Sequence, residues 1–219
     1  NNINLTKEVK ISDHPNVSTH SVDEDVHQAI IYGNITQIGL EDNVSAYFRY
    51  REKNTTEWLK SQKQNISQET SYHIVINNLK SNTTYEFQSV IEWDNRKTID
   101  DTWIFKTLKE PFFKVYITNT DQFDDFVEGE TVNINYTVNN LGDVNDTQDI
   151  KFYVDDELVD IKESITIEGG KVFSDSFNWT VKSPYGERNI TLESKNNSYT
   201  PKAIILKNAY FKVDINEPK

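Results

Sequence analysis

Hydrophobic and polar residues alternate with a period of two along most of the chain. In residues 131–139 the two kinds of position separate onto opposite faces, with Val132, Ile134, Tyr136 and Val138 on one face and Asn133, Asn135 and Thr137 on the other. This pattern is typical of a strand with one buried face. No stretch of ten or more residues repeats its apolar positions every 3.6 residues. The sequence therefore predicts an all-β protein.

The predicted strands form two groups. They cover residues 29–38, 44–51, 71–79, 84–93 and 98–107 in the first half, and 112–118, 131–139, 149–154, 157–161, 172–181, 188–194 and 203–206 in the second. Turn signals such as Asp155-Asp156 and Gly169-Gly170 separate them at the spacing of a sandwich. The 219 residues suffice for two domains of about a hundred residues each. We expect two tandem Ig-like or fibronectin III-like β-sandwiches.

An internal repeat predicts the domain boundaries. Residues 108–117, LKEPFFKVYI, and residues 206–215, LKNAYFKVDI, are identical at six of ten positions. Each copy is expected to begin a domain, which gives sandwiches at 14–108 and 109–207. Aromatic pairs bury much area at a junction, so Phe112 and Phe113, with their repeats Tyr210 and Phe211, are predicted to seat one domain against the next.

The two terminal segments allow two interpretations each. Residues 1–13, with a strand-like run at 3–11, are either the end of a preceding domain or an extra strand that adds to a neighbour's sheet edge. Residues 208–219 are either the start of a further domain or an exchanged strand. Because the sequence also lacks methionine, we expect a segment excised from a longer array. The expected partners are further copies of the chain or neighbouring domains.

N-glycosylation acceptors are the strongest local signal. Random placement of 24 asparagines and 35 serines and threonines predicts about 4 Asn-x-Ser/Thr sequons. The chain has 12, at Asn4, Asn16, Asn34, Asn43, Asn54, Asn65, Asn82, Asn135, Asn145, Asn178, Asn189 and Asn196. A glycan must point into solvent, so each occupied sequon predicts an exposed position. The alternative is that these residues serve only as turn and strand-face residues.

Composition narrows the choice of partners. The net charge of −12 disfavours nucleic acids and anionic membranes, which require clustered Lys and Arg. No apolar run approaches the 18 or so residues of a membrane span, so we expect no direct membrane insertion by this segment. The absence of cysteine excludes thiol catalysis, thiolate metal sites and disulfides. These features and the sequons predict an extracellular or cell-surface location.

The first half resembles a fibronectin type III module. Residues 79–87, LKSNTTYEF, are similar to the turn that leads into that family's strand F, where a corner tyrosine bonds back to the backbone. The segments IIYGNITQIG, VSAYFRYRE, YHIVINNL, YEFQSVIEW and TWIFKT follow in the order B, C, E, F, G. The resemblance covers about residues 14–108. The family's B-strand tryptophan is absent, so Tyr32 or a neighbouring isoleucine is expected to fill the core.

The second half resembles the cell-adhesion-related (CARDB-like, Ig-like) domain of prokaryotic surface proteins over about residues 110–207. The resemblance rests on VEGETVNINYTVNNLGD, QDIKFYVDDELVD, ITIEGG, FSDSFNWTV and YGERNITLES, with an N-x-G-D turn and a Gly-Gly turn. The pairing of the two modules, with many sequons and an acidic balance, is similar to archaeal surface glycoproteins.

Candidate metal sites come from acidic and histidine residues. Carboxylates at Asp121, Asp124, Asp125 and Glu128 are candidate Ca²⁺ ligands, as are the groups around Asp143–Asp149 and Asp155–Asp160. His14, His20 and His27 lie near one another in sequence, but their spacing matches no common zinc pattern. Solvated surface side chains are the alternative in every case. No cofactor is otherwise expected.

No enzyme signature is present in the sequence. The chain has no G-x-S-x-G elbow and no phosphate-binding glycine loop, so we expect no enzyme. Of the tryptophans, Trp179 is predicted to be core and Trp58 is the better candidate for exposure, while core or edge packing is favoured over ligand stacking for the group. The leading hypothesis is a structural or adhesive surface protein, a module of a stalk, filament or surface layer assembled by sandwich contacts or strand addition. The alternative is a binding module that recognises a carbohydrate or partner protein through loops such as 52–57.

Overall fold

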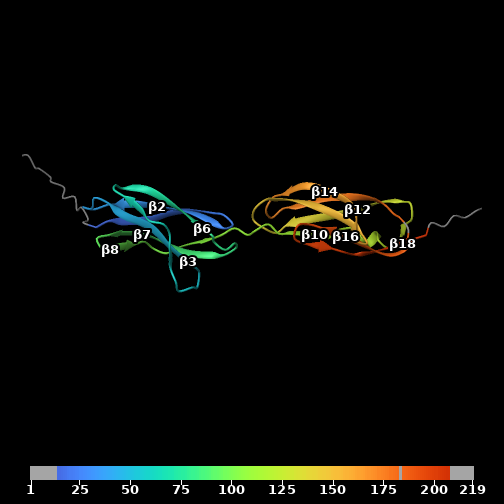
Figure 1. The fold of residues 1–219 in the computed structure, drawn as a ribbon, viewed down its shortest axis with the longest axis horizontal. Coiled ribbons are helices and arrows are strands. Elements are labelled where there is room, and N and C mark those ends of the chain that lie inside the picture. The colour runs from blue at the N-terminus through green and yellow to red at the C-terminus, as the bar shows by residue number, and fades with distance from the viewer. Residues whose placement is uncertain (1–13, 183, 208–219) are drawn as a thin grey trace, which may run out of the picture. The chain divides into compact units, whose positions relative to one another are not determined.

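The chain divides into two compact units, Asn1–Lys109 and Glu110–Lys219. The structure is a computed structural model, which describes residues 14–182 and 184–207. In that part of the chain the regular structure is almost entirely strand, with one 3-10 helix, η1 (Thr120–Gln122). The prediction of an all-β sandwich protein is thus confirmed (Figure 1). The terminal segments 1–13 and 208–219, with their two interpretations each, lie outside the described residues.

The first unit is a sandwich of two antiparallel sheets. One sheet has the order β1-β2-β6, and the other has the order β4-β3-β7-β8, with β5 on β3 and β9 on β7. The bounds are Asn16–Glu24 for β1, Gln28–Gln37 for β2, Val44–Glu52 for β3, Leu59–Lys60 for β4, Gln64–Ile66 for β5, Thr70–Asn77 for β6, Thr84–Trp93 for β7, Arg96–Ile99 for β8 and Trp103–Lys106 for β9. Their inward residues form a single buried cluster.

The second unit repeats the arrangement with its own strands. A three-stranded sheet, β10-β12-β15, faces a sheet ordered β11-β18-β16-β13-β14, with β17 on β16. The bounds are Phe113–Ile117 for β10, Phe126–Val127 for β11, Thr131–Asn140 for β12, Asp146–Val154 for β13, Glu157–Ile167 for β14, Val172–Thr180 for β15, Gly186–Glu193 for β16, Ser198–Tyr199 for β17 and Lys202–Leu206 for β18. A separate cluster fills this core.

Most predicted strands are present, and the differences have local causes. The predicted strand 98–107 is two strands, β8 and β9, because Asp100 between them accepts a hydrogen bond at Oδ2 from the Thr19 backbone N–H (2.6 Å). The predicted strand 157–161 continues to Ile167 as β14, whose pairing with β13 shifts register twice. Strand β1 is missing from the prediction because a bulge at His20 breaks its alternation.

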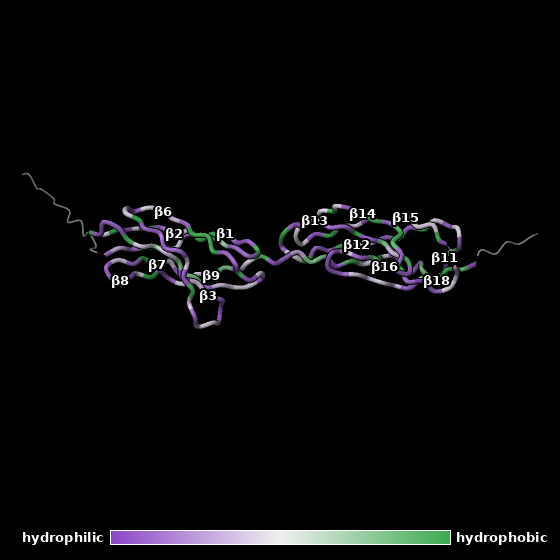
Figure 2. The backbone as a smooth tube through the Cα atoms, in the orientation of Figure 1, coloured by the Kyte–Doolittle hydropathy of each residue, from purple (hydrophilic) through white to green (hydrophobic). Residues whose placement is uncertain are grey.

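Alternation along the strands places the cores as predicted (Figure 2). In β12 the apolar positions Ile134, Tyr136 and Val138 are fully buried, whereas Asn133 and Asn135 are exposed. Tyr136 stacks on Phe177 with ring centres 5.2 Å apart, and Phe177 stacks on Phe152 at 5.4 Å. Aromatic contacts of this kind add to the hydrophobic gain of burial. Each sandwich is therefore stabilised by its own buried hydrophobic core.

The predicted corner tyrosine is confirmed. The Tyr85 hydroxyl, which is buried, accepts a hydrogen bond from the Lys80 backbone N–H at 2.9 Å. This hydrogen bond links the turn before β7 to the strand itself and so fixes the position of the turn. Thr107 adds a second tie, since its hydroxyl donates to the Lys80 carbonyl (2.6 Å).

The core position expected for the missing tryptophan is filled by one of the two predicted alternatives. Tyr32 lies on the outer face of β2 and donates its hydroxyl to Asp23 (2.8 Å), whereas Ile31 is fully buried, so the isoleucine alternative holds. The next inward residue is Gly33, and the Tyr72 ring of β6 lies directly over it. A Cβ at Gly33 would be 2.9 Å from the ring carbons of Tyr72. The glycine therefore makes room for Tyr72.

This close approach predicts the effect of one methyl group. Gly33→Ala should lower the free energy of unfolding by about 1–3 kcal/mol, because the ring must shift in a packed core. The measurement is urea unfolding of the full chain. Ser71→Ala, at an exposed position of the paired strand β6, should change the value by less than about 0.5 kcal/mol. Equal stability of the two variants would refute the packing explanation.

Candidate functional site

The described sequon asparagines lie outside the two cores. Of the eleven within the described residues, ten are exposed and Asn34 is half-buried. Asn4 lies outside the described residues. They come from both sheets of both units and from the turns between strands. Every described acceptor thus lies where a glycan can reach solvent, although occupancy itself stays a prediction.

The sequons fall into two structural classes. In seven of them the middle residue is a buried core residue, namely Val17, Ile35, Val44, Ile66, Tyr136, Trp179 or Ile190. Since side chains alternate along a strand, the asparagine and the hydroxyl two positions later share the outer face beside that core residue. The other four sequons, at Asn54, Asn82, Asn145 and Asn196, have polar middle residues and lie at turns or strand starts. Asn54 and Asn82 have positive φ, 70° and 50°.

Several acceptors use their side-chain oxygen in the fold. Asn16 Oδ1 accepts from the Val17 N–H (3.0 Å), Asn65 Oδ1 accepts from the Ser45 hydroxyl (3.0 Å), and Asn196 Oδ1 accepts from the Phe113 N–H (3.1 Å). A glycan bonds to the nitrogen, Nδ2, and leaves the oxygen as an acceptor. These hydrogen bonds are therefore compatible with modification.

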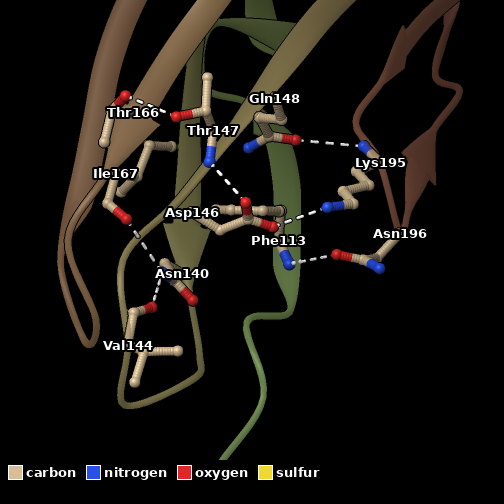
Figure 3. Close-up of polar contacts among 10 residues, drawn as sticks. All are labelled: Phe113, Asn140, Val144, Asp146, Thr147, Gln148, Thr166, Ile167, Lys195 and Asn196. Atoms are coloured by element: carbon tan, nitrogen blue, oxygen red, sulfur yellow. Dashed lines mark hydrogen bonds and ion pairs between the residues drawn. The ribbon is translucent and has the colours of Figure 1, made fainter.

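A turn at residues 194–197 closes the free side of β10 (Figure 3). Besides the bond from Phe113 N–H to Asn196, the Val115 N–H donates to Asn197 Oδ1 (3.1 Å). The Ser194 hydroxyl donates to the Phe113 carbonyl (3.0 Å). Side chains thus occupy the backbone groups through which another strand would pair with β10.

The N-x-G-D turn of the second unit is held by a buried asparagine (Figure 3). Asn140 Nδ2 donates to the carbonyls of Val144 (2.9 Å) and Ile167 (3.0 Å), and its Oδ1 accepts from the Gly142 N–H (3.0 Å). A Cβ at Gly142 would lie 2.2 Å from the Glu110 carbonyl oxygen. The motif is thus explained by packing within this unit.

The residues predicted to seat neighbouring domains are only partly described. Phe113 is fully buried in the core cluster of the second unit, and Phe112 is 41% exposed. Tyr210 and Phe211 lie outside the described residues. Phe113 therefore serves the packing of its own unit, while a junction role for Phe112 stays a prediction.

The acidic and histidine candidates are not brought together. Among the described residues, no three or more His, Asp or Glu side chains are close enough to hold a metal ion. Asp121, Asp124 and Asp125 are exposed and Glu128 is half-buried, in the segment that links η1 to β12. His14, His20 and His73 are exposed, and His27 Nδ1 lies 2.9 Å from the Leu79 carbonyl oxygen.

The other acidic groups have structural partners. Asp155 and Asp156 form the turn between β13 and β14 with positive φ, and Asp155 Oδ2 accepts from Arg188 (2.8 Å). Asp149 Oδ1 accepts from the Ser164 N–H (2.9 Å). These carboxylates hold turns and bulges, which does not support the idea that they gather around Ca²⁺.

The outer face of β3 carries a ladder of aromatic and cationic side chains. The guanidinium carbons of Arg49 and Arg51 lie 4.7 and 4.4 Å from the centre of the Trp58 ring, which is half-buried. Arg49 Nε also donates to Gln88 (2.5 Å), and Arg51 Nε donates to Glu86 (2.7 Å). Trp58, the better candidate for exposure, is therefore half-buried, because both guanidinium groups pack against its ring.

The same ladder continues at Tyr47. Its ring lies under the ammonium groups of Lys60 and Lys63 (5.5 and 5.2 Å), and its hydroxyl donates to Glu92 (2.6 Å). Burial, and then this hydrogen bond, raise the pKa of Tyr47. Hydrogen bonds from Lys63 and Tyr47 lower the pKa of Glu92. These shifts have structural causes and do not mark a reactive group.

The remaining tryptophans are divided between core and surface. Trp179 is 4% exposed, which confirms the core prediction, and Trp93 is also buried. Trp103 at the start of β9 is 42% exposed, next to Ile104 at 54%. Two surface hollows measure about 520 Å³ at the β7–β8 turn and about 460 Å³ beside Trp179.

The edge strands differ in their suitability for pairing with another chain. Strand β6 pairs with β2 through eight residues without a register shift, and it contains no Asp, Glu, Lys or Arg. Its exposed residues include Val75, 42% exposed. Strand β14 has two register shifts and charged residues, which are features that protect an edge. Strand β6 is the less protected of the two.

Lys162 bridges the open side between β14 and β15. Its ammonium group donates to Asp175 Oδ2 (2.7 Å) and lies 5.7 Å from the centre of the Phe177 ring. The hydrogen bond from Lys162 lowers the pKa of Asp175, with a smaller contribution from the Ser176 N–H. The pair therefore links the two sheets where no backbone hydrogen bond does so.

Comparison with known proteins supports the resemblance of the second half. Residues 111–200 match the sequence profile of the CARDB family. No curated protein matches the chain. Among the described residues, no helix has both the length and the apolar character to span a membrane.

The solved structures similar to the chain include modules of two kinds. The sensor domain of the anti-sigma factor RsgI4 from Pseudobacteroides cellulosolvens is 18% identical, with 42% of this chain and 74% of that chain covered and a TM-score of 0.37. The human fibronectin type III domain from the KIAA0970 protein is 14% identical, with 42% and 72% covered and a TM-score of 0.33. A second human fibronectin type III domain is 11% identical, with 47% and 91% covered and a TM-score of 0.35.

The Lys162–Asp175 pair predicts a pH-dependent stability. Because the folded state lowers the pKa of Asp175, the pair stabilises above the unfolded pKa, and this contribution is lost as the pH falls through the folded value. Asp175→Asn should cost less than about 1 kcal/mol at pH 7, because the pair is solvated. The cost should vanish near pH 2. Thermal unfolding at a series of pH values measures it.

Asp156→Asn is the matched control, since no ion pair is described for this exposed turn residue. Its difference from the native chain should not follow the same pH profile. A cost for Asp175→Asn that persists undiminished in acid would contradict the ion-pair explanation.

Proposed function

We propose that this chain forms modules of an extracellular, N-glycosylated structural or adhesive surface protein, of the archaeal kind that the sequence resembles. The observation that carries the proposal is the position of the sequons. All eleven described acceptors avoid the buried clusters of both sandwiches, even where the neighbouring residue is in the core. Glycans on these positions would coat both units without disturbing their packing.

The chemistry of the surface supports a non-catalytic role. The carboxylates and tyrosines with shifted pKa values have causes that lie in ion pairs, hydrogen bonds or burial. The net charge of −12 favours solubility and mutual repulsion outside specific contacts. A module whose surface is charged, paired and glycan-bearing is suited to spacing or adhesion.

Assembly with further copies is the second part of the proposal. Backbone groups at an unprotected sheet edge pair readily with an extended segment of another chain. Strand β6 offers such an edge through its unbroken eight-residue register and its lack of charged residues. The alternating run at residues 3–11, with Ile3, Leu5, Val9 and Ile11 on one face, is a candidate strand from a second copy.

Mass spectrometry of glycopeptides tests the glycoprotein claim. We expect intact glycans on most of the exposed sequons of protein purified from its native cells, because their asparagines are accessible. Asn77 and Asn78, which are exposed and belong to no sequon, should be unmodified in the same digest. A chain with every sequon bare would refute the glycoprotein claim.

A charged residue on β6 tests the assembly claim. Val75→Lys should weaken self-association by about tenfold or more, because an edge lysine opposes strand addition. Light scattering over a range of protein concentrations measures the effect. Val172→Lys, at an exposed position of the β15 edge in the other sandwich, should leave association unchanged. A native chain that remains monomeric at all concentrations would remove the basis for assembly.

A further inference from the structure

The chemistry of N-glycosylation makes a demand on the backbone of the acceptor. The asparagine Nδ2 forms a bond to C1 of a lipid-linked oligosaccharide, and the bond from C1 to the lipid diphosphate breaks. The diphosphate leaves with the electron pair, and the Nδ2 proton passes to a base of the transferase. The enzyme must enclose both the asparagine and the hydroxyl two positions later. The three residues of the sequon must therefore separate from the rest of the folded protein to enter the active site of the transferase.

Seven described sequons cannot leave the folded sandwich without breaking it. Their middle residues are between 0% and 8% exposed. Asn34 is an example: it is paired with Ser18 on one side and Ser71 on the other, and Ile35 beside it is in the core. To present such a sequon, the chain must break ladder hydrogen bonds and expose the core residue to water. Only local or global unfolding does this.

The four remaining sequons have no buried apolar residue in the middle position. Thr55, the middle residue of the Asn54 sequon, is exposed in the loop between β3 and β4. Thr83, Asp146 and Asn197 occupy the corresponding positions of the other three and are half-buried polar residues. Asn54 and Asn82 already have left-handed turn conformations. Presenting these sequons breaks some hydrogen bonds, such as the one from the Asn82 N–H to the Leu108 carbonyl, but it exposes no apolar core side chain.

We infer that folding divides the sequons of this chain into two groups that accept N-glycans at different stages. The turn sequons at Asn54, Asn82, Asn145 and Asn196 accept glycans on the folded protein. The core sequons, at Asn16, Asn34, Asn43, Asn65, Asn135, Asn178 and Asn189, accept them only before their sandwich closes. The inference rests on the proposed function as a glycoprotein, and it adds which sites are modified at which stage. The donor is a lipid-linked oligosaccharide.

The test uses the full chain produced in a host without N-glycosylation. The folded protein, checked by circular dichroism, is incubated with a purified single-subunit oligosaccharyltransferase and a synthetic lipid-linked oligosaccharide. Timed glycopeptide analysis gives a rate for each sequon, and the same sequons in short synthetic peptides correct for intrinsic sequence preference. Relative to the peptides, core sequons should be slower by about 10- to 100-fold, the effect expected for exposing one core side chain. Turn sequons should stay within a few-fold of the peptides.

Two variants open one sandwich at a time without altering any sequon. Phe152 is fully buried in the second unit and Phe48 is fully buried in the first. Phe152→Ala should raise the rates at Asn135, Asn178 and Asn189 and leave the core sequons of the first unit slow. Phe48→Ala should do the reverse. A variant that unfolds its unit completely gives the same expected result more strongly.

The outcomes separate this inference from the proposed function. Core sequons modified in the folded native chain as fast as turn sequons, both relative to their peptides, would overturn the inference. So would turn sequons that stay bare on the folded chain while the peptides react. Either result leaves the glycoprotein claim standing if native protein carries glycans. Bare sequons in native protein would overturn both.

Discussion

The contact between the two sheets of each unit is the interaction on which the rest of the structure depends. The chain has no cysteine, so no disulfide contributes to the stability of either sandwich. Aromatic contacts supply much of the packing. Phe48 stacks on Tyr72 and Phe87 meets Phe105 edge-on in the first unit, and Tyr136, Phe177 and Phe152 stack in the second. Burial of aromatic side chains gives a large gain in a small core. Gly142 and Gly169 let loop backbones of the second unit approach closely, since an added Cβ would meet the Glu110 or the Asp143 carbonyl oxygen.

The same contact determines what the surface can carry. A strand that buries every second residue exposes the residues between, so an Asn-x-Thr with an apolar middle residue is placed automatically with its asparagine outward. Asn178, Trp179 and Thr180 illustrate this, with Trp179 in the core and the other two exposed. The pattern of buried core residues therefore fixes where these sequon asparagines lie. Under the proposed glycosylation, the stability of each sandwich would determine whether these sequons are modified before or after folding.

Polar contacts then fix the ends and edges that hydrophobic packing leaves open. Asn140 holds a loop to two strands, and Asn196 and Asn197 close the side of β10. Lys162 bridges the sheets beside β15. Strand β6 has an unbroken register and no charged residue, which makes it the natural candidate for contact with another copy.

The sequence alone determined the class of fold, most strands and the outward position of the acceptors, because alternation is a local property of the extended backbone. It also identified the corner tyrosine through a short motif, LKSNTTYEF. Tertiary structure alone decided that Tyr72 fills the space over Gly33, that Arg49 and Arg51 cover Trp58, and that the acidic groups stay apart. These outcomes depend on strand register, which brings together residues far apart in the sequence. Bulges such as those in β1 and β14 shift that register where the alternation along the chain does not reveal them.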